Sequence, residues 1–259
     1  MNIQTLKTKA NSNYHSLGKC FHRDSSLSNE TLMDFLNAMG DAESTGHPKQ
    51  YPALSSIPLK SSRLSRWAKW LSGMTGIFKR RATVRDFSAT ISQVMLANLL
   101  LTALQPGKMR SEGLRQRPYP SAGGLYGVSS YLLSRSVDGI KSGMYNINAD
   151  RQCLEQIDLF ESVDSCDRWI KRNIVGEGAI QQAPAYIILA GNLQLIEKKY
   201  SDRAYRFLLL EAGHIAQNIG LVATMLNMAH VPLGGFCENN IEKFIADPDM
   251  LALYVIAVG

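Results

Sequence analysis

The feature that most constrains the fold is a long series of apolar residues at helical spacing in the last quarter of the chain. Apolar side chains recur at intervals of three and four from about residue 201 onwards. They are Tyr205, Leu208, Leu209, Ala212, Ala216, Ile219, Val222, Ala223 and Leu226. Because these positions surround much of the helix, it should lie at the centre of the molecule. Ser201 is predicted to cap it, and Asp202 suits the positive end of its dipole.

Shorter patterns predict both helices and strands around this central helix. Residues 91–104 predict a helix with Ser92 as its N-cap. Residues 128–134, 184–191 and 251–259 are rich in the branched and aromatic side chains typical of strands. Residues 142–158 predict a hairpin that turns at residues 148–150. Because strands and helices do not alternate regularly, the order favours an α+β fold over a doubly wound sheet.

The first part of the chain differs from the rest. Residues 1–60 are polar and rich in turn residues, so they are predicted to form an extension or a cover. Within them, residues 28–40 could form a helix capped by Ser28 or Asn29. No apolar run in the 259 residues approaches a membrane span, and the N-terminus has no apolar signal core. These absences predict a cytoplasmic protein without a membrane partner.

Positive charge is concentrated in one segment. The net charge is +6, and residues 44–111 contain eleven Lys or Arg against one acid, Asp86. Such a segment could meet nucleic acid, an anionic cofactor, an acidic peptide or a membrane surface, and charge alone leaves these open. Residues 61–74 predict a helix with a basic and an apolar face. It either binds a peptide or an anionic surface or packs on the core, and we favour packing.

No metal site is predicted. The cysteines are widely spaced and form no zinc pattern; they are Cys20, Cys153, Cys166 and Cys237. His214 is interpreted as a core residue of the central helix. Asp247 and Asp249 stand in a loop without the ligand pattern of a cation site.

Residues 81–85 could bind an anion. Arg81, Thr83 and Arg85 alternate, so in an extended chain they would point the same way. Two guanidinium groups and a hydroxyl could hold a phosphate by charge-assisted hydrogen bonds. A solvated basic run is the other interpretation, and residues 81–85 alone slightly favour it.

The stretch "RPYPSAGGLYG", residues 117–127, leaves the backbone bare. Glycine permits unusual dihedral angles, and Pro118 and Pro120 stiffen the approach. It does not match the GxGxxG pattern of dinucleotide sites. Its N–H groups could instead meet a planar ligand or a phosphate, or the stretch is an ordinary tight turn.

Lys199 and Tyr200 directly precede the central helix. A lysine ammonium and the positive end of a helix both favour the phenolate of a nearby tyrosine. Tyr200 could therefore accept a proton, with Lys199 beside it. The alternative is a surface lysine next to a half-buried tyrosine.

Taken in order, these stretches resemble the nitroreductase-like flavoproteins. More narrowly, they resemble the SagB-type dehydrogenases, which are azoline oxidases of thiazole/oxazole-modified peptide biosynthesis. The supporting stretches are "KQYPALSSIPLK", "RRATVRDF", "RPYPSAGGLYG", "GMYNIN", "KKYSDRAYRFLLLEAGHIAQN", "GGF" and "LYVIAVG". The resemblance spans about residues 45–259. It implies an FMN-binding α+β domain at residues 61–259, with a mixed or antiparallel sheet flanked by helices around a long central helix.

The resemblance also implies site residues and a homodimer with FMN at the subunit interface. Arg81, Thr83 and Arg85 match the phosphate-binding pattern, with threonine in place of serine. The stretch that lies along the flavin is matched by Pro120, Ser121, Ala122 and Gly123. Gly234 and Gly235 match a later glycine loop near the flavin, and Lys199 and Tyr200 match the catalytic pair. Gly127 departs from the pattern, because proline is common at that position.

The implied reaction oxidises thiazoline or oxazoline rings, made by a cyclodehydratase in a ribosomally made precursor peptide, to thiazole or oxazole. A base, Tyr200 or Lys199, would take the α-proton while the flavin takes a hydride. The alternatives are a general NAD(P)H-dependent nitro or quinone reductase with the same FMN, and a flavin-free interaction protein. The lysine–tyrosine pair favours the first, because a reductase of small acceptors needs no substrate base. The implied partners are the precursor peptide and cyclodehydratase subunits, without nucleic acid.

Overall fold

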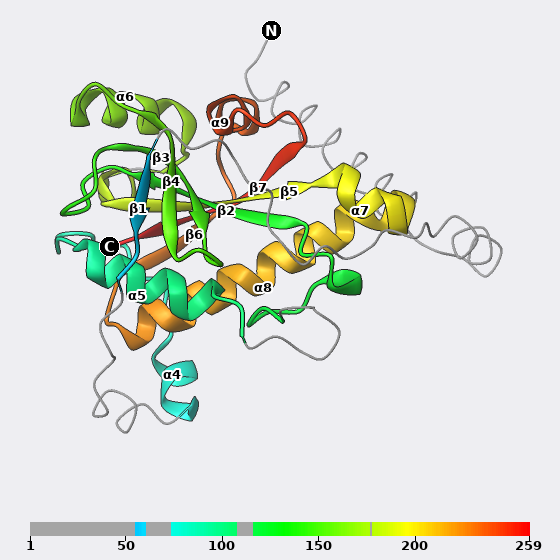
Figure 1. Ribbon diagram of the computed structural model, residues 1–259. Helices are drawn as coiled ribbons and strands as arrows, with labels where there is room; N and C mark the ends of the chain where they lie inside the picture. The colour runs from blue at the N-terminus through cyan, green and yellow to red at the C-terminus, as the bar shows by residue number, and fades with distance from the viewer. Residues whose placement is uncertain (1–54, 61–73, 108–115, 177) are drawn as a thin grey trace, which may run out of the picture.

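A computed structural model describes residues 55–60, 74–107, 116–176 and 178–259. Within them, seven strands form one sheet in the order β1-β4-β3-β2-β5-β7-β6, and every neighbouring pair is antiparallel (Figure 1). The strands are β1 (Ser56–Pro58), β2 (Val128–Ser134), β3 (Gly143–Asn148), β4 (Cys153–Leu159), β5 (Ala185–Asn192), β6 (His230–Leu233) and β7 (Met250–Val258).

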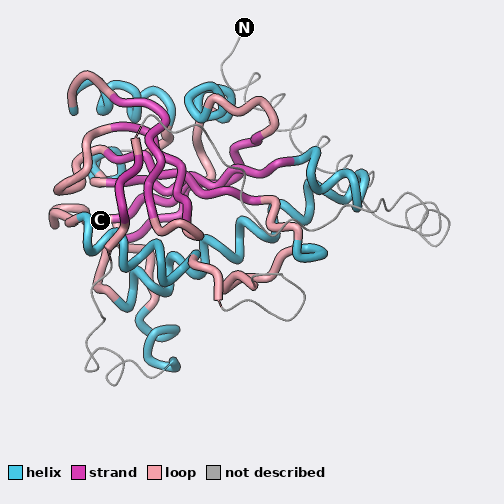
Figure 2. The backbone as a smooth tube through the Cα atoms, viewed as in Figure 1, coloured by secondary structure: helices cyan, strands magenta, loops and turns pink. Residues whose placement is uncertain are grey.

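Helices lie on both faces of this sheet, which gives three layers (Figure 2). The α-helices are α4 (Met74–Arg80), α5 (Gln93–Leu104), α6 (Val163–Asn173), α7 (Leu193–Tyr200), α8 (Ala204–Met225) and α9 (Glu238–Ile245). Three short 3₁₀ turns join them: η1 (Ala122–Gly124), η2 (Gly178–Gln182) and η3 (Ser201–Arg203). Helices α5 and α8 cover one face, and α6 and α9 cover the other.

The alternation of side chains along the strands explains the two layers. In β5, Ile187 and Leu189 pack in the core that contains α5 and α8. Tyr186 and Ile188 pack in the opposite core with α6 and α9. Because successive side chains of a strand point to opposite faces, a strand apolar at every position must be covered on both sides. β5 lies inside the sheet and meets this condition.

Most of the predicted elements are confirmed. The α+β class, the central helix, the hairpin β3–β4 and the strands β2, β5 and β7 all form. The hydroxyl of Ser92 accepts a hydrogen bond from Met95 N, as expected of an N-cap. The helix predicted at residues 28–40 lies outside the described residues, and so does the one predicted at 61–74 except for Met74, where α4 begins. The sequence patterns do not predict α4, α6, α7, α9, β1 or β6.

The predicted start of the central helix is wrong. Helix α8 begins at Ala204, and its N-cap position is Arg203, whose side chain makes no capping bond. Ser201 instead ends α7 with φ +46°, a left-handed backbone value that a non-glycine residue rarely adopts. The chain therefore breaks directly after Tyr200, which places this side chain at a corner between two helices.

The interpretation of His214 as a core residue is also wrong, because its side chain is exposed on α8. Among the described residues, no helix has both the length and the apolar character needed to cross a membrane.

Candidate functional site

The glycine-rich stretch forms a tight turn at the end of α7. Residues Ala122–Gly124 make the 3₁₀ turn η1, and Gly123 and Gly124 have φ values of +58° and +68°. These left-handed values favour glycine, because a Cβ atom would be strained there.

The backbone of Gly123 lies against both members of the lysine–tyrosine pair. A Cβ atom on Gly123 would stand 2.6 Å from Tyr200 Oη and 3.1 Å from Lys199 Nζ. The two polar ends therefore converge on one point of the glycine loop, although 75 residues separate Gly123 from Lys199. Only a residue without a side chain fits between them. The structure thus brings together two of the predicted site segments.

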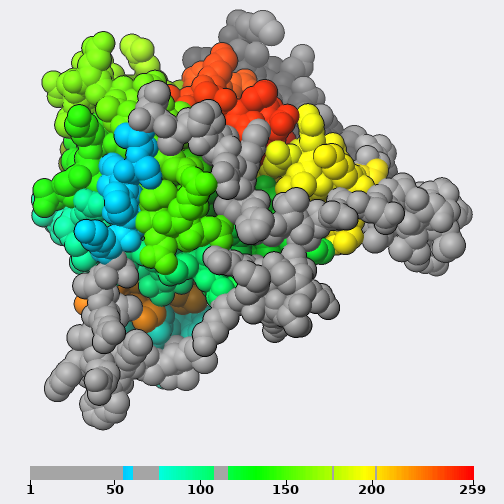
Figure 3. All heavy atoms as spheres, in the orientation of Figure 1, coloured from blue at the N-terminus to red at the C-terminus, as the bar shows by residue number. Residues whose placement is uncertain are grey.

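The corner after α7 fixes the direction of Tyr200. Its ring meets Phe207 edge-on, with 4.7 Å between ring centroids. Lys199 Nζ lies 5.8 Å from the centroid of the Tyr200 ring, within the range of a cation–π contact. Figure 3 shows α7, in yellow, at the surface on the side of the molecule away from β1, in blue. The pair is therefore positioned by packing, and both side chains are half-buried.

A buried carboxylate on α8 holds the glycine loop in place. Glu211 is only 3% exposed, and it accepts hydrogen bonds from Ser121 Oγ at 2.5 Å and from Val128 N at 3.1 Å. Ser121 Oγ in turn accepts a bond from Tyr126 N at 2.8 Å. Burial raises the pKa of the Glu211 carboxyl above its ordinary value, and the loop hydrogen bonds partly oppose that rise. One side chain therefore fastens both ends of the loop to the central helix.

The side chain of Ser121 belongs to the inner side of the loop. Its hydroxyl is directed inward to Glu211, so a ligand on the outer side of the loop would meet backbone rather than this hydroxyl. The sequence patterns do not single out Glu211. The available signal was an acidic residue in a helix that is otherwise almost entirely apolar or neutral, since Glu211 is the one acidic residue within α8.

A groove of about 590 Å³ follows the same stretch of chain. Its lining consists of Gln116, Arg117, Pro118, Tyr119, Pro120, Ser121, Gly124 and Tyr126. Arg117 stiffens its wall, because it pairs with Asp150 at 3.0 Å and lies 5.3 Å from the centroid of the Tyr126 ring. This size suits a cofactor or a small substrate.

The other predicted cofactor residues lie beside β6. Val84 N donates to His230 O at 3.1 Å, which places residues 81–85 along this strand. Burial and the nearby Arg81 lower the pKa of His230. Thr83 and Arg85 are exposed. The segment therefore lies near the position of Gly220 on α8, whose Cβ would stand 3.0 Å from His230 Nε2.

Close packing explains why glycine stands at two of the three positions Gly127, Gly234 and Gly235. A Cβ on Gly235 would come 2.8 Å from Val175 Cβ, and one on Gly127 would come 2.7 Å from two carbons of Ile196. Gly127 thus allows the loop to sit against α7. Gly234 has no neighbour within 4 Å of a Cβ position, so packing does not require it. Among the described residues, no group of three metal-ligating side chains forms a cation site.

Comparison with known proteins agrees with this fold. Residues 78–259 match the nitroreductase family. The chain belongs to the nitroreductase family. It is therefore a nitroreductase-family oxidoreductase, of a family that typically binds FMN.

Two curated relatives are similar in sequence. The protein MJ1384 of Methanocaldococcus jannaschii, named as a nitroreductase, is 30% identical over 169 residues, which are 65% of this chain and 81% of that protein. The microcin B17-processing protein McbC of Escherichia coli is 26% identical over 201 residues, 74% of this chain and 67% of that protein.

Solved structures share the nitroreductase fold. A protein of Anabaena variabilis, also named as a nitroreductase, superposes with a TM-score of 0.72 at 24% identity. This match covers 93% of the present chain but 46% of the Anabaena chain. The E. coli microcin synthetase McbBCD complex with truncated pro-MccB17 contains a chain that matches with a TM-score of 0.59 at 20% identity, over 92% of this chain and 85% of that one.

If Glu211 fastens the loop through Ser121, the two side chains must be energetically coupled. Ser121→Ala and Glu211→Gln should each lower the free energy of unfolding by about 1–3 kcal/mol, because each leaves buried polar groups without their partners. The double variant should lose less than the sum, by about 0.5–3 kcal/mol. Urea unfolding of the four proteins measures this difference. Additive losses would show that the hydrogen bond does not couple the loop to α8.

Proposed function

We propose that this chain is an FMN-dependent dehydrogenase that oxidises thiazoline or oxazoline rings in a ribosomally made precursor peptide to thiazole or oxazole. The observation that carries the proposal is the convergence of Lys199 Nζ and Tyr200 Oη on the bare backbone of Gly123. An oxidation that removes a carbon-bound proton needs a base at the site where the cofactor lies. A family member that only reduces small acceptors would not need this pair.

The residues around Gly123 fit a flat cofactor. The loop offers backbone without a side chain, next to a groove of cofactor size. In this proposal the loop residues that lie along FMN are Pro120, Ser121, Ala122 and Gly123. Arg81, Thr83 and Arg85 would bind its phosphate, with Gly234 and Gly235 near them. When bound, FMN would supply an acceptor for the hydride that leaves the substrate ring.

In the proposed reaction, a side chain of the protein removes the proton from the substrate. Tyr200 Oη or Lys199 Nζ would accept the α-proton of the azoline, so that the ring loses one proton and one hydride in total. Because Phe207 and the break at Ser201 fix the Tyr200 ring, the base would be oriented before the substrate binds. The hydrogen bonds of Glu211 to Ser121 and Val128 would keep the loop, and with it the cofactor, at a constant distance from this base.

The comparison with the microcin proteins supports the proposed partners. McbC is described as a microcin B17-processing protein, and the matching solved chain comes from the McbBCD complex with truncated pro-MccB17 bound. By analogy, we assign to this chain a precursor peptide as substrate and cyclodehydratase subunits as partners.

We also propose a homodimer. One group of candidate cofactor residues is bonded to α8 through Ser121 and Glu211. The other group lies beside His230, which packs against α8 at Gly220, nine residues or about 14 Å from Glu211 along the helix axis. A cofactor between two subunits could use one group from each. Leu209 and Leu210 on α8 and Phe78 on α4 are large apolar side chains that are 41%, 58% and 58% exposed, and a second copy would cover them.

The central test is mass spectrometry of an azoline-containing precursor peptide incubated with the FMN-loaded protein. The wild type should remove two hydrogens per ring. Tyr200→Phe and Lys199→Ala should each reduce this rate by about a hundredfold or more, because each removes a group proposed to take or assist the proton, while FMN absorbance is retained.

Lys198→Ala and Tyr205→Phe are the matched controls, since both alter neighbouring residues of the same type. They should stay close to the wild-type rate. Full activity of both site variants would contradict the assignment of the base. Rapid NADPH oxidation with a nitroaromatic acceptor, and no loss of hydrogen from the azoline peptide, would favour the general reductase instead.

Sedimentation velocity tests the homodimer. The wild type should sediment at twice the chain mass of 28.7 kDa. Replacing Leu209 and Leu210 together by Arg should shift it to the monomer, because charged groups would be buried in the interface. Val94→Arg on α5, at a side chain that is 44% exposed, should not. A monomeric wild type would overturn the proposal.

A further inference from the structure

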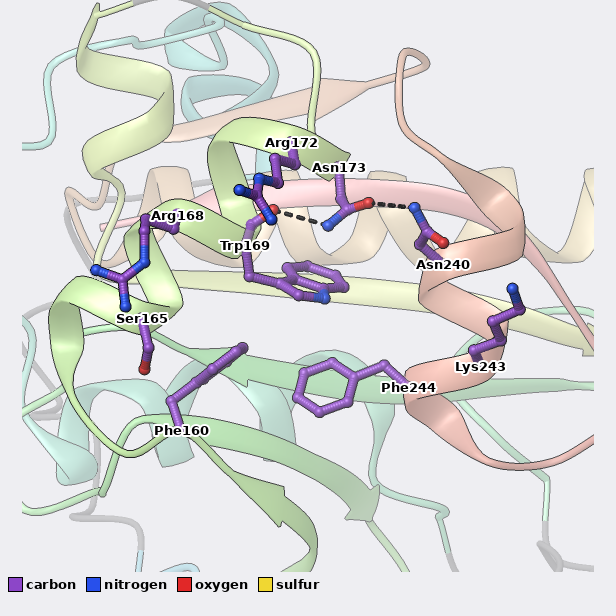
Figure 4. Close-up of a pocket in the computed structure, with 9 residues that line it drawn as sticks. All are labelled: Phe160, Ser165, Arg168, Trp169, Arg172, Asn173, Asn240, Lys243 and Phe244. Atoms are coloured by element: carbon purple, nitrogen blue, oxygen red, sulfur yellow. Dashed lines mark hydrogen bonds between the residues drawn. The ribbon is translucent and has the colours of Figure 1, made fainter.

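A second groove lies on the other face of the sheet, between α6 and α9 (Figure 4). Its volume is about 550 Å³. Its lining consists of Phe160, Ser165, Arg168, Trp169, Arg172, Asn173, Asn240, Lys243 and Phe244. In each helix the lining residues recur at intervals of three and four, so each helix presents one continuous stripe to the groove. None of these residues belongs to the site around Gly123.

The floor of the groove is aromatic. Phe160, Trp169 and Phe244 point toward one another in Figure 4, and their ring centroids are 5.2 to 6.2 Å apart. All three rings are only partly buried. All three contacts are tilted, and such contacts hold aromatic side chains in fixed positions. The floor is therefore a preformed apolar surface that remains accessible.

The rim of the groove is positively charged. It carries Arg168 and Arg172, four residues or about 6 Å apart along α6, and Lys243 of α9. Within the described part of the chain, none of these three cations forms an ion pair.

Two acids of these helices, Asp167 and Glu242, bond to groups other than the rim cations. Asp167 of α6 is paired with Arg135, at 2.5 Å and 3.1 Å. Glu242 of α9 accepts a bond from Ala252 N at 2.9 Å. The described lining contains no carboxylate.

At one end of the groove, side-chain amides form a hydrogen bond that joins α6 to α9. Asn240 Nδ2 donates to Asn173 Oδ1 at 2.7 Å, and Asn173 Nδ2 donates to Trp169 O at 2.8 Å (Figure 4). Asn173 is 4% exposed. This bond joins the two helices directly, so the width of the groove is set by the fold and does not depend on a ligand.

We infer that this groove docks an acidic segment of a partner protein, which inserts an aromatic or aliphatic side chain onto the aromatic floor. Guanidinium groups bind carboxylates in a bidentate manner, and unpaired cations around an apolar recess are complementary to carboxylates that flank an apolar anchor. Nucleic acid is a poorer match, because its affinity comes from many phosphate contacts and the rim offers three cations. This inference does not rest on the proposed function, since the groove shares no residue with the site.

Fluorescence anisotropy with the full-length, FMN-loaded protein tests the inference. The probe is a fluorescein-labelled peptide, Asp-Glu-Leu-Trp-Glu-Asp. Two control peptides carry Ala in place of Leu and Trp, or Lys in place of the acids, and oligouridylate is the nucleic-acid control. The acidic peptide with its apolar anchor should bind the wild type tightest of the four.

The combined variant Arg168→Glu with Arg172→Glu should weaken this binding by about tenfold or more, because both carboxylate contacts become repulsive. Trp169→Ala should weaken it similarly. Lys171→Glu is the matched control, since Lys171 is exposed on α6 but does not line the groove, and it should change affinity by less than about threefold. The arginine variant should keep the wild-type melting temperature.

Several outcomes would overturn the inference. Equal binding to the wild type and to the arginine variant would place the peptide elsewhere. An equal loss in Lys171→Glu would indicate unspecific charge attraction. Tighter binding of oligouridylate through the same arginines would indicate a nucleic-acid site. Self-association of the wild type that the arginine variant abolishes would show that a second copy fills the groove.

Discussion

The site depends on the carboxylate of Glu211. It is buried in the central helix, and it gains its partners from Ser121 and from the backbone at the start of β2. A buried charge without partners would be costly, so the loop must stay attached for the helix to remain packed. This requirement fixes the loop relative to α8. Since Tyr200 lies at the break just before α8, it also fixes the loop relative to the lysine–tyrosine pair.

Apolar periodicity, apolar runs and helix capping, all of which are local properties of the sequence, predict much of the fold. The period of the apolar residues indicated α8, continuous apolar runs indicated β5 and β7, and Ser92 capped α5 as expected. The start of α8 could not be read locally. A serine before a helix is a common cap, whereas Ser201 has a left-handed conformation next to the packed pair Tyr200 and Phe207. Residues outside the described ranges leave the boundary at residue 60 a prediction.

The separate segments of the site can be predicted from the sequence, but the contacts that bring them together cannot. Gly123, Lys199 and Tyr200 were singled out separately, and the contact between them joins segments far apart in the chain. Glu211 and Ser121 are 90 residues apart, and no local rule selects that partner. On each face of the sheet, the covering helices position the functional residues. Helix α8 positions the site on one face, and α6 and α9 form the walls of the basic aromatic groove on the other.

The amount of FMN bound after Gly123→Ala tests most directly whether the cofactor lies against the glycine loop. We expect the affinity for FMN to fall by about tenfold or more, because the new methyl group would stand 2.6 Å from Tyr200 Oη on a left-handed backbone. Gly213→Ala, at an open position of α8, should bind FMN like the wild type. Wild-type FMN affinity in a folded Gly123→Ala protein would contradict the claim that the cofactor lies against this loop.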